Sequence, residues 1–253
     1  MDSVGPPRPA STLLVVRDAE AGAEVLMVRR NLQSDFVGGA FVFPGGAVDP
    51  SDATMTRVAG LSEADADAVL GVVGARAYFV AALRELFEEA GVLVARDGRG
   101  APLVVDLAPA RRELNAGRLG FDEVLEREGL WLDLSGLAYL AHWVTPVGPP
   151  RRYDTRFFVV RAPAGQEAAH DDAETVAAVW VRPLDALAAQ ARGEYEMIFP
   201  TIRTLQSIAH LGAADEVLAF ARSQRRVERV EPRLIERDGS VRVVVPGDEG
   251  YED

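Results

Sequence analysis

The chain contains no cysteine among its 253 residues. This absence excludes disulfide bonds, thiolate metal sites and cysteine nucleophiles, and it suits a reducing compartment, so we expect a cytoplasmic protein. Histidine is scarce as well, and the three histidines, His142, His170 and His210, lack zinc-ligand spacing. We expect His142 in the core and His210 at the surface. The sequence also has no Gly-x-Ser-x-Gly, which argues against a serine hydrolase.

Basic residues are in deficit, with 27 against 39 acidic residues and a net charge of −12. Such a charge disfavours binding to nucleic acid or to anionic membranes. A membrane-spanning run of about 20 apolar residues is missing too, because Arg76 interrupts the longest candidate, around residues 69–83. Residues 1–9 lack a basic segment followed by an apolar core, so we expect no secretory signal. These features argue against nucleic-acid and membrane partners.

One stretch, residues 84–92, has the spacing of an acidic helix that ends at Gly91. Glu85, Glu88 and Glu89 are three and four positions apart and therefore share a face. Three crowded carboxylates repel one another, and a divalent cation would offset that repulsion. The plain alternative is a solvated acidic surface. The opposite face carries an apolar stripe made of Phe79, Leu83, Leu86, Phe87 and Ala90.

The pattern Arg-Glu-x-x-Glu-Glu-x-Gly, together with an upstream Phe43-Pro44-Gly45-Gly46 turn, resembles the Nudix hydrolase motif. The family pattern is Gly, five residues, Glu, seven residues, then Arg-Glu, an apolar residue, any residue, Glu-Glu, any residue and Gly. Its second half matches from Arg84 to Val92, but its first half matches only at Gly46. About 24 extra residues separate Gly46 from Arg84, so the first Glu of the motif cannot be placed from the sequence.

The resemblance implies a Nudix-type α/β/α sandwich with a mixed β-sheet. It also implies hydrolysis of a diphosphate that links a nucleoside to another group. Mg²⁺ or Mn²⁺ would be held by the matched positions Glu85, Glu88 and Glu89, with Glu89 also expected to be catalytic. Arg84 is expected to orient a motif carboxylate. The general base varies in the family. The candidates are the motif glutamates and the loop acids Asp171, Asp172 and Glu174, with Glu174 preferred and solvated loop acids an equal alternative.

A narrower resemblance points to the coenzyme A diphosphatase branch of the family. It rests on residues 26–30, residues 39–49 with Asp52, the large insertion and residues 198–201. Gly45 and Gly46 would let the backbone approach the substrate closely. Candidates for binding the 3′-phosphate are arginines, which hold phosphate with paired hydrogen bonds: Arg30, for which a surface role is equally expected, Arg151, Arg152 and Arg156.

Two other functions stay open at this point. The first is hydrolysis of ADP-ribose, NADH or a nucleotide sugar. The second is a Nudix-fold binding or regulatory module without turnover, which the complete glutamate set disfavours. A homodimer is the default expectation for the assembly.

The resemblance implies a Nudix domain over residues 10–206, and we expect C-terminal helices and a hairpin over residues 207–253 to pack on the same domain. Helical insertions are expected at about 51–75 and 96–135. We expect their acids Asp52, Glu63, Asp65 and Asp67 to be solvated. The predicted strands cover 12–17, 24–30, 40–43, 91–95, 137–144, 154–161, 174–181 and a terminal hairpin within 229–245 turning at Asp238-Gly239. Besides the acidic helix, the predicted helices cover 64–70, 109–116, 121–128, 184–191, 200–211 and 214–223.

Overall fold

A computed structural model describes residues 5–32, 38–101, 103, 106–171, 174–237 and 240–251. Its strands are β1 (Arg8–Ala19), β2 (Gly22–Arg30), β3 (Phe41–Val42), β4 (Gly45–Ala47), β5 (Val58–Ala59), β6 (Ala95–Asp97), β7 (Leu130–Asp133), β8 (Ala138–Val144), β9 (Tyr153–Arg161), β10 (Thr175–Val181), β11 (Arg229–Val230), β12 (Arg233–Arg237) and β13 (Ser240–Val244). Its helices are α1 (Pro50–Thr54), α2 (Glu63–Leu70), α3 (Arg76–Ala90), α4 (Ala108–Asn115), α5 (Phe121–Arg127), α6 (Pro183–Ala191), α7 (Phe199–Ile208) and α8 (Ala214–Ser223).

The main sheet is mixed and has the order β10-β2-β1-β9-β8-β11, with β3 beside β2 and β4 beside β1. Strand β1 is parallel to β9 and antiparallel to β2 and β4. It therefore brings the glycine turn of β4 next to the start of β9, because Ser11 has both Gly46 and Arg156 as register partners. This junction positions the candidate site.

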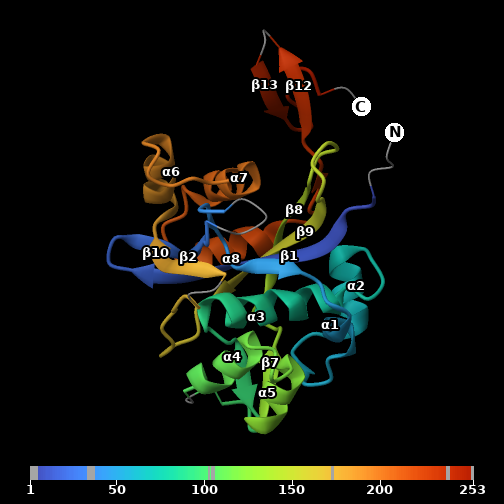
Figure 1. Ribbon diagram of the computed structural model, residues 1–253, viewed down its shortest axis with the longest axis vertical. Helices are drawn as coiled ribbons and strands as arrows, with labels where there is room; N and C mark the ends of the chain where they lie inside the picture. The colour runs from blue at the N-terminus through green and yellow to red at the C-terminus, as the bar shows by residue number, and fades with distance from the viewer. Residues whose placement is uncertain are drawn as a thin grey trace.

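Helices cover both faces of the sheet (Figure 1). Alternating side chains of β1 enter two cores, because successive residues of a strand point to opposite faces. Leu13 and Val15 pack with α3, whereas Leu14 and Val16 pack with α6, α7 and α8. The predicted α/β/α sandwich with a mixed sheet is confirmed. Among the described residues, none of the helices combines the length and apolar character needed to cross a membrane.

The two insertions pack around α3: α1 and α2 lie at its N-terminal end, and α4, α5 and β7 lie on its side away from the main sheet (Figure 1). They contribute α1, α2, α4 and α5 and a small sheet with the order β5-β7-β6. The predicted strand at 91–95 is wrong, since Gly91 caps α3 in a left-handed conformation and the strand begins only at Ala95. Residues 91–94 follow an irregular path, in which Leu93 donates to and accepts from the Gln166 side chain instead of a neighbouring strand.

The C-terminal segment divides into parts that lie in different places. Helix α8 packs on the sheet, and β11 extends the sheet parallel to β8. The β12–β13 hairpin projects from one end of the molecule (Figure 1). The predicted terminal hairpin is thus confirmed for 233–244 only, and its expected turn, Asp238-Gly239, lies outside the described residues.

Candidate active site

The acidic helix is α3, and its glutamates are not a solvated surface. Only 9% of Glu85 and 2% of Glu89 is exposed. The helix buries its apolar stripe between the sheet and the insertions. Phe79 packs against Phe158 of β9 with the ring centroids 4.4 Å apart, and Phe87 packs against Phe121 of α5 with the centroids 6.0 Å apart. This packing fixes the opposite face of α3 under the glycine turn of β4. The alternative of a solvated acidic face is therefore wrong for these two residues.

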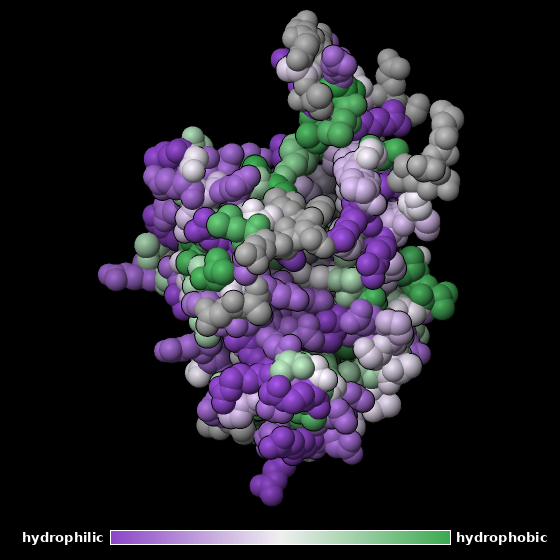
Figure 2. Space-filling view, in the orientation of Figure 1, coloured by the Kyte–Doolittle hydropathy of each residue, from purple (hydrophilic) through white to green (hydrophobic). Residues whose placement is uncertain are grey.

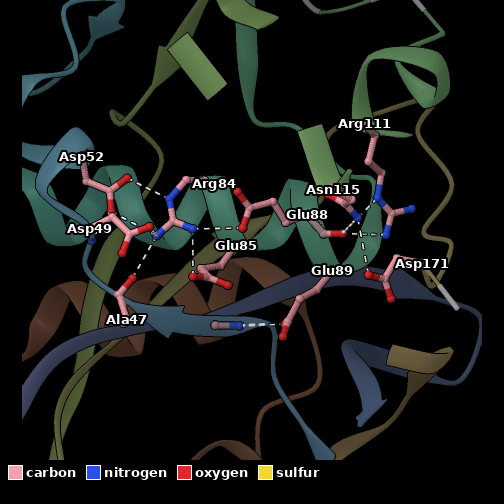
Figure 3. A network of polar contacts seen from close by, with 11 residues as sticks. Ala47, Asp49, Asp52, Arg84, Glu85, Glu88, Glu89, Arg111, Asn115 and Asp171 are labelled. Atoms are coloured by element: carbon pink, nitrogen blue, oxygen red, sulfur yellow. Dashed lines mark hydrogen bonds and ion pairs between the residues drawn. The ribbon is translucent and has the colours of Figure 1, made fainter. Parts of the chain in front are cut away.

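Arg84 binds three of the acidic side chains of the site, those of Asp52, Glu85 and Glu88 (Figure 3). Its Nη1 donates to Glu85 Oε1 and to Glu88 Oε2, both at 2.9 Å, and its Nε donates to Asp52 Oδ1 at 2.9 Å. Its Nη2 donates to the Ala47 carbonyl oxygen at 2.9 Å. Burial opposes the charge on Arg84, but the hydrogen bond that it donates to Asp52 and the charges of the surrounding carboxylates outweigh this effect and raise the pKa of the guanidinium.

Asp52 is the functional residue that the sequence interpretation misplaced. Its side chain is fully buried and binds Arg84 through both oxygens, so the prediction that it is solvated is wrong. Asp52 lies six positions after Gly46, where the family pattern has its first Glu. Counting five residues from Gly46 would have found it, with Asp in place of Glu. The insertion within the motif therefore lies between Asp52 and Arg84.

The glycine turn approaches the glutamates closely. The Gly45 amide donates to Glu89 Oε2 at 3.0 Å. A Cβ atom at Gly46 would overlap with the Glu85 carboxylate, and one at Gly45 would overlap with the Ser11 carbonyl. Both positions therefore require glycine because of close approach, since neither has a positive φ angle.

Burial raises the pKa of all three glutamates, and that of Glu85 reaches about 7. The charge of Glu85 also raises the pKa of Glu89, although Arg30 and the Gly45 amide oppose this. A cluster of buried carboxylates is the donor set that a hard divalent cation prefers. As they are placed, no three acidic or imidazole groups among the described residues converge closely enough to hold an ion. The donor chemistry fits a cation. Because Glu88 is turned toward Arg84 and Glu89 toward Gly45, however, their rotamers would have to change to bind one.

The candidate bases on the loop before β10 differ in what they contact. Asp171 Oδ1 accepts hydrogen bonds from the Glu174 amide at 3.0 Å and the Thr175 amide at 2.8 Å, so Asp171 shapes the loop. Glu174 lines the cavity beside the glutamates, and its charge helps to raise the pKa of Glu85, Glu88 and Glu89. Asp172 lies outside the described residues.

A cavity of about 430 Å³ opens beside these groups. Its lining includes Arg30, Gly45, Gly46, Glu85, Glu89 and Glu174. Of the predicted site residues, Arg84 and Glu88 lie in the network behind the cavity wall. Arg156 is not brought to the cavity. Tyr153, Thr155 and Phe157 of β9 line it, and strand alternation places Arg156 on the opposite face, paired with Asp154 and above the Tyr78 ring.

The two other candidate arginines have different surroundings. Arg152 donates to the Thr145 carbonyl oxygen and pairs with Glu231, while Arg151 is exposed. The histidine predictions are confirmed: His142 is buried with Nε2 2.8 Å from Asp154 Oδ1, and His210 is exposed.

The second insertion contacts the end of α3, which the sequence did not predict. Buried Arg111 of α4 donates to the Glu88 carbonyl oxygen through Nη2 at 2.9 Å and to the Ala169 carbonyl oxygen through Nη1 at 2.8 Å. Asn115 donates to the same Glu88 oxygen at 3.0 Å (Figure 3). The insertion thus connects the glutamate helix with the loop that carries Glu174.

The fold and the glutamate site define a Nudix hydrolase. The structure is similar to the crystal structure of a NUDIX hydrolase from Alicyclobacillus acidocaldarius, with a TM-score of 0.72 and 35% sequence identity. That similarity covers 86% of this chain and 97% of the other. Nudix hydrolases generally use divalent metal ions.

Within this class, a family model described as the NUDT19 Nudix domain matches residues 55–207, more than half of the chain, and the chain belongs to this family. The chain is also 26% identical to the acyl-coenzyme A diphosphatase NUDT19 of Xenopus laevis, over 90% of this chain and 71% of that protein. It is 29% identical to the Gallus gallus protein of the same name, over 90% of this chain and 72% of that protein.

Proposed function

We propose that the protein hydrolyses the diphosphate of coenzyme A or an acyl-coenzyme A, giving 3′,5′-adenosine diphosphate and (acyl-)4′-phosphopantetheine. The observation that carries this proposal is the pair of buried glutamates on the cavity wall, Glu85 held by Arg84 and Glu89 held by the Gly45 amide. Burying several carboxylates together destabilises the folded protein. A binding module without catalysis has no need of them, so their presence favours an enzyme. The names of the vertebrate relatives support the substrate.

Glu85, Glu88 and Glu89 would hold Mg²⁺ or Mn²⁺. A bound divalent ion would neutralise charge on the phosphate oxygens and lower the pKa of an attacking water. Arg84 orients Glu85 and Glu88 through the hydrogen bonds described above. Glu174 is the proposed general base, since it lines the cavity beside Glu85 and Glu89. Arg30 would bind a phosphate at the same wall.

We further propose residues 10–206 as the catalytic unit, acting in the cytoplasm on a small nucleoside diphosphate derivative. The family match over residues 55–207 supports the first part, and the absence of cysteine suits the second. A homodimer is a proposal that sedimentation of the purified protein would test.

The substrate is tested by product analysis with mass spectrometry. The purified protein is incubated with Mg²⁺ or Mn²⁺ and, in separate reactions, coenzyme A, octanoyl-coenzyme A, dephospho-coenzyme A, ADP-ribose and NADH. We expect 3′,5′-adenosine diphosphate from coenzyme A or its octanoyl ester. The proposal fails if dephospho-coenzyme A and ADP-ribose are both much better substrates than either.

A further inference from the structure

The cavity beside the glutamates has two chemically different parts. One part carries the ionisable side chains of Arg30, Glu85, Glu89 and Glu174. The other is formed by the start of α7, the end of β8 and the C-terminal hairpin, and most of its side chains are apolar, although Thr145 and Thr201 also line it. The apolar side chains are Trp143, Phe199, Pro200, Pro232, Leu234 and Val243. In Figure 1, α3 lies below the strands of the main sheet and the hairpin lies above them. Because residues of both line one cavity, the cavity extends from the glutamates to the hairpin.

The hairpin presents an aliphatic face to this cavity. Leu234 and Val243 are directly opposite each other in the β12–β13 register, so their side chains lie on one face. They are 48% and 39% exposed, although both line the cavity. Apolar surface also gathers where the hairpin joins the body (Figure 2). Leaving two large apolar side chains open to water is unfavourable, and an apolar ligand that covered them would reverse this.

The charged groups around the base of the hairpin are already engaged. Glu231 pairs with Arg152 through Oε1 and accepts from Arg229 through Oε2 at 2.8 Å. The Arg233 guanidinium lies over the Tyr251 ring at 4.6 Å. These cations are therefore compensated or stacked within the chain, and the side chains that the hairpin turns to the cavity are aliphatic. Such a face suits a saturated hydrocarbon chain better than a phosphorylated nucleoside, which needs free cations and hydrogen-bonding groups.

We propose that Pro232, Leu234 and Val243 bind the acyl chain of an acyl-coenzyme A, and that this contact makes the enzyme favour acylated over free coenzyme A. The inference rests on the proposed function, because it presupposes that a coenzyme A thioester occupies the cavity. It adds an assignment to the C-terminal hairpin, which lies beyond the matched family residues 55–207. The diphosphate would lie at the glutamates and the acyl chain would extend along the hairpin.

The test compares kcat/KM for octanoyl-coenzyme A with kcat/KM for coenzyme A in the full-length protein. Wild type, Leu234→Ser, Val243→Ser and Leu234→Met are measured with the same divalent ion. The matched control is Leu184→Ser, because Leu184 is also exposed, at 62%, but lies on α6 away from the cavity lining. Thermal melting of each variant checks that it is folded.

We expect wild type to favour octanoyl-coenzyme A. The two serine variants should lower the octanoyl to free coenzyme A ratio by about tenfold, the scale of a lost apolar contact in a specificity pocket. Leu234→Met and Leu184→Ser should keep the wild-type ratio. An unchanged ratio in both serine variants overturns the inference, and an equal loss on both substrates would assign the hairpin to the part they share. A wild type that cleaves neither substrate overturns the proposed function, and with it this inference, so the two failures are distinguishable.

Discussion

Arg84 shows at the scale of single residues how the site tolerates so much buried acid. One guanidinium reaches Asp52, Glu85 and Glu88, while Glu89 depends on the Gly45 amide. The arginine thus fixes two of the three motif glutamates from behind the cavity. The carboxylate of Asp52 anchors Arg84 itself, although Asp is one methylene shorter than the Glu of the family pattern.

Removing the charge of Asp52 should therefore loosen the site. Asp52→Asn should lower the free energy of unfolding by about 3 kcal/mol, the low end for breaking a buried ion pair, because Glu85 and Glu88 still compensate Arg84. Chemical denaturation measures the change, and kcat should fall with it. Asp52→Glu, which keeps the carboxylate, should retain more of both. Equal stability of wild type and Asp52→Asn would show that the pair does not anchor the site.

Glu89 is the residue whose charge should matter most for turnover. Glu89→Gln keeps an oxygen that can accept from the Gly45 amide, so the fold should persist. The variant should lose kcat by about a thousandfold, the scale of removing one major electrostatic contact with the transition state. Steady-state kinetics and thermal melting measure the two effects. The matched control is Glu126→Gln at an exposed position on α5, and a Glu89→Gln variant as active as that control would contradict the metal-ligand role.

At the scale of elements, the second insertion serves as a brace. Helix α4 contributes Arg111, which connects the Glu88 carbonyl oxygen at the end of α3 with the Ala169 carbonyl oxygen. The loop from Ala169 then leads to Asp171, which orders Glu174. An element outside the motif therefore determines how the proposed base lies relative to the glutamates.

Replacing Arg111 should displace that loop. Arg111→Met should lower kcat by tenfold to a hundredfold, since a misplacement of about 1 Å has effects of that size. KM should change little if the substrate contacts stay in place. Hydrogen exchange of the backbone amides at 174 and 175 should rise in parallel. Arg112→Met removes a neighbouring exposed arginine and should behave as wild type, and equal kinetics for the two variants would argue against a brace.

The same elements show what the sequence could and could not predict. The sequence predicts α3, its Gly91 cap and strands β8, β9 and β10 to within a few residues. Long patterns of alternating or helical spacing are strong signals. Strands β4, β5 and β7 and helix α1 were missed because elements of two to five residues carry almost no periodicity. Arg156 was placed in the site by charge alone, since its face depends on strand register that only the fold determines.

At the scale of the whole molecule, binding of a divalent ion should couple to folding. Burial raises the pKa of Glu85, Glu88 and Glu89, which means that their shared ionisation is unfavourable in the metal-free protein. A cation would reverse that cost in the folded state only. Mg²⁺ takes carboxylate and water oxygens as ligands, and these three carboxylates are crowded on one helix, so the glutamate cluster should dominate the response.

We therefore expect Mg²⁺ to raise the melting temperature of wild type by about 3 to 6 °C at ten times the dissociation constant. Binding to the folded state alone stabilises it by about 1.4 kcal/mol at that concentration. For a protein of this size, that stabilisation corresponds to the stated rise in melting temperature. Glu88→Gln loses its ion pair with Arg84 but also a carboxylate whose charge is disfavoured, so without metal it should be about as stable as wild type. The variant should lose most of the Mg²⁺ shift. Thermal melting in EDTA and in excess Mg²⁺ measures both, with Glu126→Gln as the control that keeps the full shift. An equal shift in wild type and Glu88→Gln would place the ion elsewhere on the protein.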